Sequence, residues 1–412
     1  MNISRADQYY RKKLIVANKF FNDILRCNIF RNGNIEEKIS TIEIIAEFNW
    51  AYHTGRYSSG SIDSFINQIT SEINEIKLQA GDNISAVKFS AFIATKLYDT
   101  GGHTRLLENI AKYEKSRSSA NILIVCDQTF EKLPQRIQAL THNLFDKIIC
   151  LGDKGSLDKI KVIRDRIFES DRVYNFQHPD DAEPSIALNF EERPFTIYVN
   201  HADHVFWLGA KYCDCVLNIR PFAKDITIHR RNDKVPSIIL PVKIDLNKKL
   251  LEKKEARAIL RINDDEIVLL TISVFSKVIP DRNYNFFKTI KKVLSINEKI
   301  KYYFVGITAE EYEKITKESV PDRLVCMGLV EDPSIYQCAA DFYLEGMPIN
   351  SLTALIESAY AGAFPVLMWG PHHVNMNLEL ELFLEGIVFP GYLTLKILLL
   401  NYYYFIATCF LN

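Results

Sequence analysis

The sequence has no excess of charge of either sign. Its 50 lysine and arginine residues are balanced by 51 aspartate and glutamate residues, which gives a formal net charge of −1 at pH 7. A chain without a net positive field is not expected to hold nucleic acid by long-range attraction. We therefore expect no nucleic-acid partner, and any recognition of phosphate has to be local.

The sequence also lacks a secretory signal and a disulfide framework. Residues 1–21 include charged side chains such as Arg5 and Lys12 in place of an uninterrupted apolar segment. The eight cysteines are scattered, and only Cys213 and Cys215 lie close together. Scattered cysteines are typical of reduced thiols in a cytosol. These absences predict a cytoplasmic protein.

What the 412 residues do contain is two series of short β-rich runs separated by amphipathic stretches. This alternation predicts two Rossmann-like, doubly wound α/β domains, at residues 81–243 and 244–390. Residues 1–80 have apolar residues at helical spacing and form a predicted helical extension. This extension is either a cap on the next domain or, less in keeping with its lack of a period, a helical-repeat hairpin.

The predicted strands place polar residues at the ends where parallel sheets bind ligands. The runs are 87–95, 121–126, 147–151, 196–199, 215–219 and 237–242 in the first domain, and 267–274, 301–305, 324–327, 341–344 and 364–368 in the second.

A glycine pair follows the first of these strands. Gly101 and Gly102 stand directly before an amphipathic helix, with His103 and Arg105 beside them. Glycine lets the backbone approach a ligand closely, and the amides at a helix start attract phosphate or carboxylate. The pair is therefore either a ligand-binding loop or only a tight turn between strand and helix.

The segment 342–366 is the most informative in the chain. It is predicted to form a strand, a Gly/Pro loop that begins at Glu345, a helix capped by Ser351 and a second strand. The amides of Leu352 and Thr353 would then face an anion. Glu357 lies one to two turns into the helix, where its carboxylate could accept hydrogen bonds from a sugar diol.

This segment resembles the donor-binding segment of GT-B glycosyltransferases. The resemblance extends over roughly residues 86–373, and it implies that Glu357 binds the ribose of a nucleotide-sugar donor. Lys277, with Arg282 as a second candidate, stands where a basic residue of the family reaches the donor diphosphate. Glu345 is a catalytic candidate, but its spacing from Glu357 is wider than is usual in the family, which leaves retention or inversion open.

The resemblance also bears on cofactors. No Asp-x-Asp triplet occurs in the sequence, so the metal-bridged diphosphate of the other main glycosyltransferase architecture has no obvious ligand here. We expect neither a metal nor another cofactor. Helix amides and a basic side chain would then neutralise the leaving nucleoside diphosphate.

The densest group of ionisable residues follows the run 196–199. His201 or Asp203 could accept the proton of the acceptor, with the other residue orienting it, and His204 lies beside them. An alternative is a zinc site that adds Cys213 and Cys215 to the two histidines. A purely structural use of the histidines is the third interpretation.

The last segment, 391–412, has one charged residue and does not fit the rest of the pattern. We expect a truncated or frame-shifted end rather than membrane contact at the inner surface or a buried helix.

The expected function is glycosyl transfer from a nucleotide sugar to an unidentified acceptor, which could be a glycan, a lipid-linked glycan or a protein. A sugar-nucleotide epimerase of the same fold and a catalytically degenerate scaffold remain the alternatives.

Overall fold

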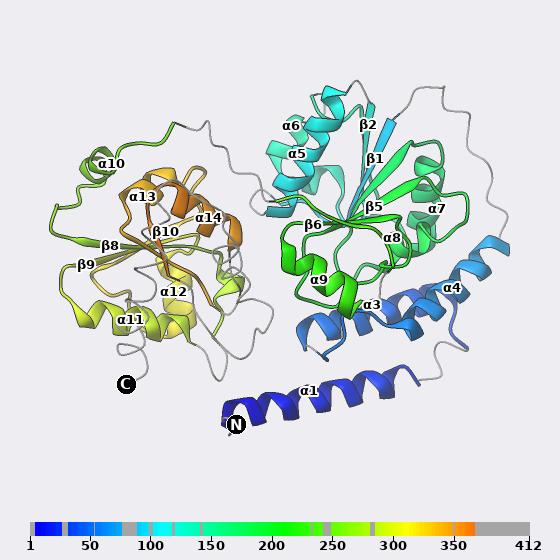
Figure 1. Cartoon of the computed structure of the whole chain (residues 1–412), viewed down its shortest axis with the longest axis horizontal. Helices are drawn as coiled ribbons and strands as arrows, with labels where there is room; N and C mark the ends of the chain where they lie inside the picture. The colour runs from blue at the N-terminus through cyan, green and yellow to red at the C-terminus, as the bar shows by residue number, and fades with distance from the viewer. Residues whose placement is uncertain are drawn as a thin grey trace. The chain divides into compact units, whose positions relative to one another are not determined.

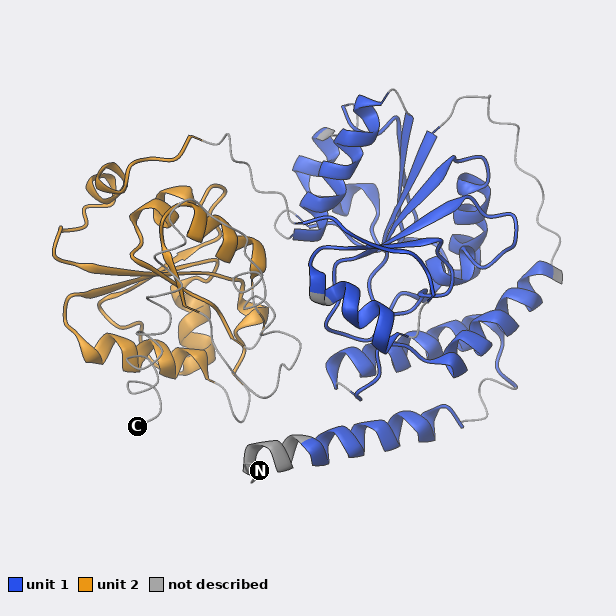
Figure 2. Ribbon diagram, viewed as in Figure 1, with its two compact units in different colours: residues 1–243 blue, residues 244–412 orange. Residues whose placement is uncertain are grey.

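A computed structural model gives the architecture of the chain, which divides into two compact units, residues 1–243 and 244–412 (Figure 1, Figure 2). The structure describes residues 5–26, 32–52, 54–75, 89–98, 102–117, 120–140, 143–231, 234–241, 249–280, 285–347, 349 and 351–366. Gly101, Arg282 and the segment 391–412 lie outside these residues.

Within its described residues, the first unit begins with helices α1, α3 and α4 and continues into a parallel sheet of seven strands in the order β3-β2-β1-β4-β5-β6-β7. Its elements are α1 (Arg5–Ile24), α3 (Ile35–Ala51), α4 (Gly60–Glu75), β1 (Phe89–Ala94), α5 (Gly102–Ser116), β2 (Ala120–Val125), η1 (Phe130–Lys132), α6 (Gln135–Leu140), β3 (Lys147–Cys150), α7 (Ser156–Ile167), β4 (Arg172–Phe176), α8 (Ala182–Ala187), β5 (Phe195–Asn200), β6 (Cys215–Asn218), α9 (Pro221–Arg230) and β7 (Ser237–Ile239).

The second unit has a parallel sheet of five strands in the order β10-β9-β8-β11-β12. Its elements are α10 (Lys253–Ile259), β8 (Ile267–Ile272), η2 (Phe275–Lys277), α11 (Phe286–Ile296), β9 (Ile300–Val305), α12 (Ala309–Thr316), β10 (Leu324–Gly328), α13 (Ser334–Ala339), β11 (Phe342–Leu344), α14 (Leu352–Tyr360) and β12 (Phe364–Val366). Two parallel sheets with interleaved helices confirm the predicted fold class.

One strand of the first sheet was not predicted from the sequence. β4 pairs with both β1 and β5, so it lies near the centre of the sheet. Its run of Val173, Tyr174 and Phe176 is interrupted by Asn175, which hides the apolar pattern that a buried parallel strand usually shows. Asn175 is nevertheless buried, because its amide donates to the side chain of Gln177 at 2.7 Å.

The amino-terminal helices share a hydrophobic core with the first sheet. Phe21 of α1, Ile42 of α3 and Ile66 of α4 belong to the same buried cluster as Ala91 and Ile93 of β1. A capping box, in which the Asn34 side chain and Glu37 satisfy each other's backbone amides, fixes the start of α3. The helices therefore form a cover on the first unit.

Candidate functional site

The carboxyl edge of the first sheet carries three histidines. His103 lies in the first turn of α5, His178 follows β4 and His201 follows β5. The ring centroids of His103 and His201 are 5.2 Å apart, and those of His103 and His178 are 5.7 Å apart. Tyr98, which follows β1, stacks parallel to His178 at 6.2 Å. These four rings come from three neighbouring strands and one helix and form a histidine cluster.

Burial favours the neutral form of the three imidazoles in the histidine cluster. Burial lowers the pKa of His201 well below its ordinary value, and the neighbouring imidazoles lower it further. Burial likewise lowers the pKa of His103, and burial followed by the nearby His103 lowers the pKa of His178 to about 4. Neutral imidazole is the form that can accept a proton.

Hydrogen bonds to carbonyl groups determine which ring nitrogen of two of these histidines carries the proton. Nδ1 of His201 lies 3.2 Å from the carbonyl oxygen of Val199, which can only accept a hydrogen bond. Nδ1 is therefore the protonated nitrogen, and Nε2 of His201 keeps a free lone pair. In His103 it is Nε2 that donates, to the carbonyl of Lys96 at 2.9 Å.

Asp203 forms a buried ion pair. Its side chain is 2% exposed, and both of its carboxylate oxygens accept from Arg220, at 2.5 Å and 2.8 Å. Burial raises the pKa of Asp203, but the Arg220 guanidinium and His204, at 3.4 Å, outweigh burial and hold this pKa below its ordinary value. The sequence placed Asp203 beside His201, whereas the structure commits its carboxylate to Arg220.

An acidic group lies behind the histidine cluster. The Oγ1 of Thr95 donates to Asp181 at 2.5 Å and accepts from the backbone amide of His178 at 2.8 Å. Within the described residues, Asp181 forms with Glu43 and Glu183 the one group of three His, Cys, Asp or Glu side chains whose candidate ligand atoms all lie within 4.8 Å of one another. The alternative zinc set of His201, His204, Cys213 and Cys215 does not meet this condition.

The carboxyl edge of the second sheet is built from glycine and small polar residues. Gly306, after β9, has a φ of +104°, and an added Cβ would lie 2.3 Å from the carbonyl oxygen of Ser273. Gly346, after β11, would place a Cβ 3.4 Å from the Ser273 hydroxyl oxygen, a buried oxygen without a hydrogen-bond partner among the described residues. A side chain is thus excluded at Gly306, and Gly346 packs closely against the same serine.

Glu345 holds the loop that leads into α14. Its side chain is 1% exposed, and Oε1 accepts from the backbone amides of Gly346 at 3.1 Å and Ser351 at 2.8 Å. One carboxylate oxygen therefore joins the two ends of a loop that the sequence analysis assigned to donor binding. This geometry gives Glu345 a positioning role.

The prediction that the Ser351 side chain caps α14 is wrong. Ser351 is the N-cap residue, but with φ −126° and ψ 67° its hydroxyl makes no hydrogen bond to the helix. The hydroxyl instead accepts from Nζ of Lys277 at 3.2 Å. The carbonyl of Lys277 also accepts from the amide of Ile349 at 3.0 Å. Lys277, which the sequence analysis proposed for the diphosphate, is thus brought to the start of α14.

The remaining predicted donor residues lie on α14. Leu352 and Thr353 form its first turn, so their amides stand at the end where a helix leaves N–H groups without intrahelical partners. Glu357 lies in the same helix and is half-buried. In the first unit, Gly102 and Arg105 belong to α5 and are exposed, next to the histidine cluster.

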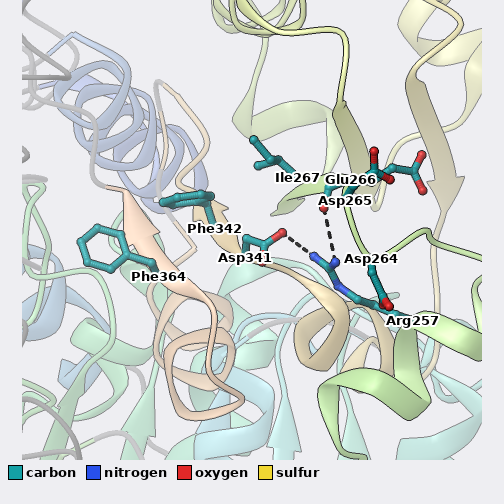
Figure 3. Close-up of a pocket in the computed structure, with 8 residues that line it drawn as sticks. All are labelled: Arg257, Asp264, Asp265, Glu266, Ile267, Asp341, Phe342 and Phe364. Carbon is teal, nitrogen blue, oxygen red and sulfur yellow. Dashed lines mark hydrogen bonds and ion pairs between the residues drawn. The ribbon is translucent and has the colours of Figure 1, made fainter.

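A separate pocket of about 500 Å³ lies at the opposite edge of the second sheet (Figure 3). Arg257 there donates to Asp341 at 2.5 Å and to the carbonyl of Glu266 at 3.3 Å, and Phe342 packs edge to face on Phe364. These residues precede β8, β11 and β12 or begin them. Since ligands of parallel sheets bind beyond the carboxyl ends of strands, this pocket is a structural feature of the strand starts.

Two members of the histidine cluster received no role in the sequence analysis. Neither His178 nor Tyr98 was singled out from the sequence, and β4, the strand before His178, was not predicted. The signal that could have found them is the short β-branched and aromatic run of β4, which places the next residues at the same edge as those after β1.

Comparisons with known proteins rest on structure alone, since no protein-family model and no curated protein sequence matches this chain. The Anabaena protein HepE, solved in complex with UDP, is 11% identical, with a TM-score of 0.51 over 72% of this chain and 90% of HepE. The chain has the GT-B fold.

Two further solved structures are similar at lower TM-scores. A glycosyltransferase from Rickettsia africae is 12% identical and has a TM-score of 0.49 over 73% of this chain and 89% of its own. An O-GlcNAc transferase from Thermobaculum terrenum is 11% identical and has a TM-score of 0.47 over 91% of this chain and 71% of its own. Among the described helices, none combines the length and the apolar character that crossing a bilayer requires.

Proposed function

We propose that the chain is a glycosyltransferase that moves a sugar from a nucleotide-sugar donor to a hydroxyl group of an acceptor, without a metal ion. The observation that supports this proposal most directly is the meeting of the Lys277 ammonium with the Ser351 hydroxyl at the start of α14. A cation and the free amides of a helix start form a binding site for a diphosphate.

In this proposal the donor lies on the second unit. The diphosphate contacts Lys277 and the amides of Leu352 and Thr353, with Arg282 as a second cation. Glu357 accepts hydrogen bonds from the ribose. Glu345 does not touch the donor and keeps the loop in place through its two backbone hydrogen bonds.

The acceptor lies on the first unit. Its hydroxyl oxygen attacks the anomeric carbon, the bond from that carbon to the diphosphate breaks, and the hydroxyl proton passes to Nε2 of His201, the nitrogen with the free lone pair. Asp203 positions the loop that carries His201 through its pair with Arg220. His103, His204 and Arg105 contact the acceptor, whereas the glycine pair at Gly101 and Gly102 contributes to donor binding.

Incubation with a panel of nucleotide sugars in excess EDTA tests the reaction. A transferase releases free nucleoside diphosphate by slow hydrolysis, whereas an epimerase forms a new nucleotide sugar and a degenerate scaffold forms neither product. Since HepE was solved with UDP, UDP-sugars are the first to test. Activity that EDTA abolishes and Mn²⁺ or Mg²⁺ restores would contradict the metal-free part of the proposal.

Calorimetry with UDP tests the donor site itself. Lys277→Ala removes one charge-assisted hydrogen bond to the diphosphate, and we expect UDP affinity to fall by about 10-fold to 100-fold. Lys288→Ala is the matched control, since Lys288 is an exposed lysine on α11 of the same unit. Equal UDP affinity in the two variants would remove Lys277 from the site.

A further inference from the structure

The first helix, α1, is fixed to the first unit by one face. Phe21 is fully buried in the shared core, and Arg56, from the loop after α3, lies over its ring at 5.1 Å. Arg56 also donates to the side chains of Asn18 at 2.9 Å and Asn22 at 3.2 Å. Figure 2 shows α1 at the periphery of this unit. The orientation of its outer face is therefore determined by packing.

The outer face of α1 combines apolar and basic side chains. Lys12, Ile15, Val16, Lys19 and Phe20 follow the helical spacing that places residues on one side. Ile15 and Val16 are each 67% exposed, and both lysines are exposed. Phe20 lies at the border of this face: it is 50% exposed, and its ring packs against Phe48 of α3 with the ring centroids 4.8 Å apart. Neighbouring exposed apolar side chains of this size usually mark a surface that is covered by a partner.

The charge of α1 identifies the kind of partner. The helix contains five basic and two acidic residues, a net charge of +3 in a chain whose net charge is −1. A second copy of the chain would bring the same positive face against itself, which costs energy. An anionic bilayer offers both an apolar layer for the isoleucine, valine and phenylalanine and negative headgroups for the lysines.

We propose that α1 is a membrane-surface helix that lies on anionic lipid through Lys12, Ile15, Val16, Lys19 and Phe20. The helix binds in the plane of the headgroups and does not cross the bilayer. This surface is independent of the proposed transfer reaction, so the two proposals can fail separately.

Flotation of the full chain with lipid vesicles tests this surface. We expect binding to phosphatidylcholine vesicles that contain phosphatidylglycerol to exceed binding to pure phosphatidylcholine by about 10-fold, and to weaken in high salt. The double variants Ile15→Gln/Val16→Gln and Lys12→Gln/Lys19→Gln should each lower the binding by about 10-fold. All four residues are exposed, so the thermal unfolding midpoint should stay unchanged.

Matched controls carry the same changes elsewhere on the first unit. Ile44→Gln replaces an exposed isoleucine of α3, 58% exposed, and Lys154→Gln replaces an exposed lysine before α7. Both controls should bind vesicles as the unmodified chain does. Three results would overturn the proposal: vesicle binding that the α1 variants do not change, which would assign it to another segment such as 391–412; equal binding to both lipids; or a dimer that only the α1 variants disrupt.

Discussion

At the carboxyl edge of the first sheet lie three imidazoles and a buried ion pair, whereas the same edge of the second sheet is made of glycines, serine hydroxyls and Lys277. Both edges belong to parallel sheets with the same relation of strands to helices. The first holds imidazoles and a carboxylate, and the second holds backbone amides and a cation. Two sheets of the same type thus present different chemical groups, and the difference lies in the residues that follow each strand.

The largest expected effect comes from removing the proton acceptor of the first edge. His201→Ala should lower turnover by about 100-fold to 10,000-fold and leave UDP affinity nearly unchanged, because a general base acts in the transition state rather than in donor binding. His229→Ala is the control, since His229 is exposed on α9 of the same unit. Steady-state kinetics measures the turnover, and calorimetry measures the UDP affinity. Full turnover in His201→Ala would show that His201 is not the proton acceptor.

The next effect concerns the ion pair beside His201. Arg220→Met leaves the Asp203 carboxylate buried without its cation, which costs about 3 to 5 kcal/mol in the free energy of unfolding. Arg117→Met, at an exposed residue just after α5, is the control and should change that free energy by less than about 0.5 kcal/mol. Urea unfolding measures both. A loss in Arg220→Met no larger than in the control would mean that the pair does not hold the His201 loop.

A pH effect is a further difference between the two units, because a group of three acidic side chains, Glu43, Asp181 and Glu183, lies behind the first edge. Burial, followed by the nearby Glu183, raises the pKa of Glu43 from 4.5 to about 7. The folded state then binds the proton more tightly than the unfolded state, so the free energy of unfolding falls as pH rises from the unfolded toward the folded pKa. This shift corresponds to about 3 kcal/mol.

Glu43→Gln should remove this loss. Relative to the unmodified chain, the variant should gain about 3 kcal/mol in the free energy of unfolding between about pH 4 and about pH 8. Glu169→Gln, at an exposed residue in the turn after α7, is the control and should show no such gain. Urea unfolding across this pH range checks the prediction. If the free energy of unfolding of Glu43→Gln changes with pH in the same way as that of the unmodified chain, ionisation of Glu43 does not destabilise the fold.

The sequence predicts the positions of ligand-facing residues better than their contacts. Of the twelve strands in the part of the chain that the structure describes, eleven followed from apolar runs, and so the places of His201, Lys277 and Glu345 after strands could be predicted. β4 could not be predicted, since Asn175 interrupts its apolar pattern. The hydrogen bond from the Asn175 side chain to Gln177, which allows Asn175 to be buried, forms in the folded chain.

Contacts between residues that are far apart in the sequence could not be predicted either, because they form only in the folded chain. Asp203 meets Arg220, seventeen positions away, and Lys277 meets Ser351, seventy-four positions away. Local sequence gave Ser351 a capping role because serine at a helix start usually caps. In the folded chain the Ser351 hydroxyl instead accepts a hydrogen bond from Lys277, and it makes no hydrogen bond to the helix amides.

The smallest expected effect sharpens the comparison at the second edge. Glu357→Gln keeps the size of a half-buried side chain on α14 and removes its charge, so the fold should persist. We expect UDP binding to weaken by about 1 to 3 kcal/mol, the range of a charge-assisted hydrogen bond to a ribose hydroxyl. Glu313→Gln, on α12 of the same unit, is the control. Deoxyribose UDP separates this contact from a general charge effect: if Glu357 binds the ribose, the variant and the unmodified chain should bind the deoxy nucleotide with similar affinity, whereas a difference that persists would place Glu357 outside the ribose contact.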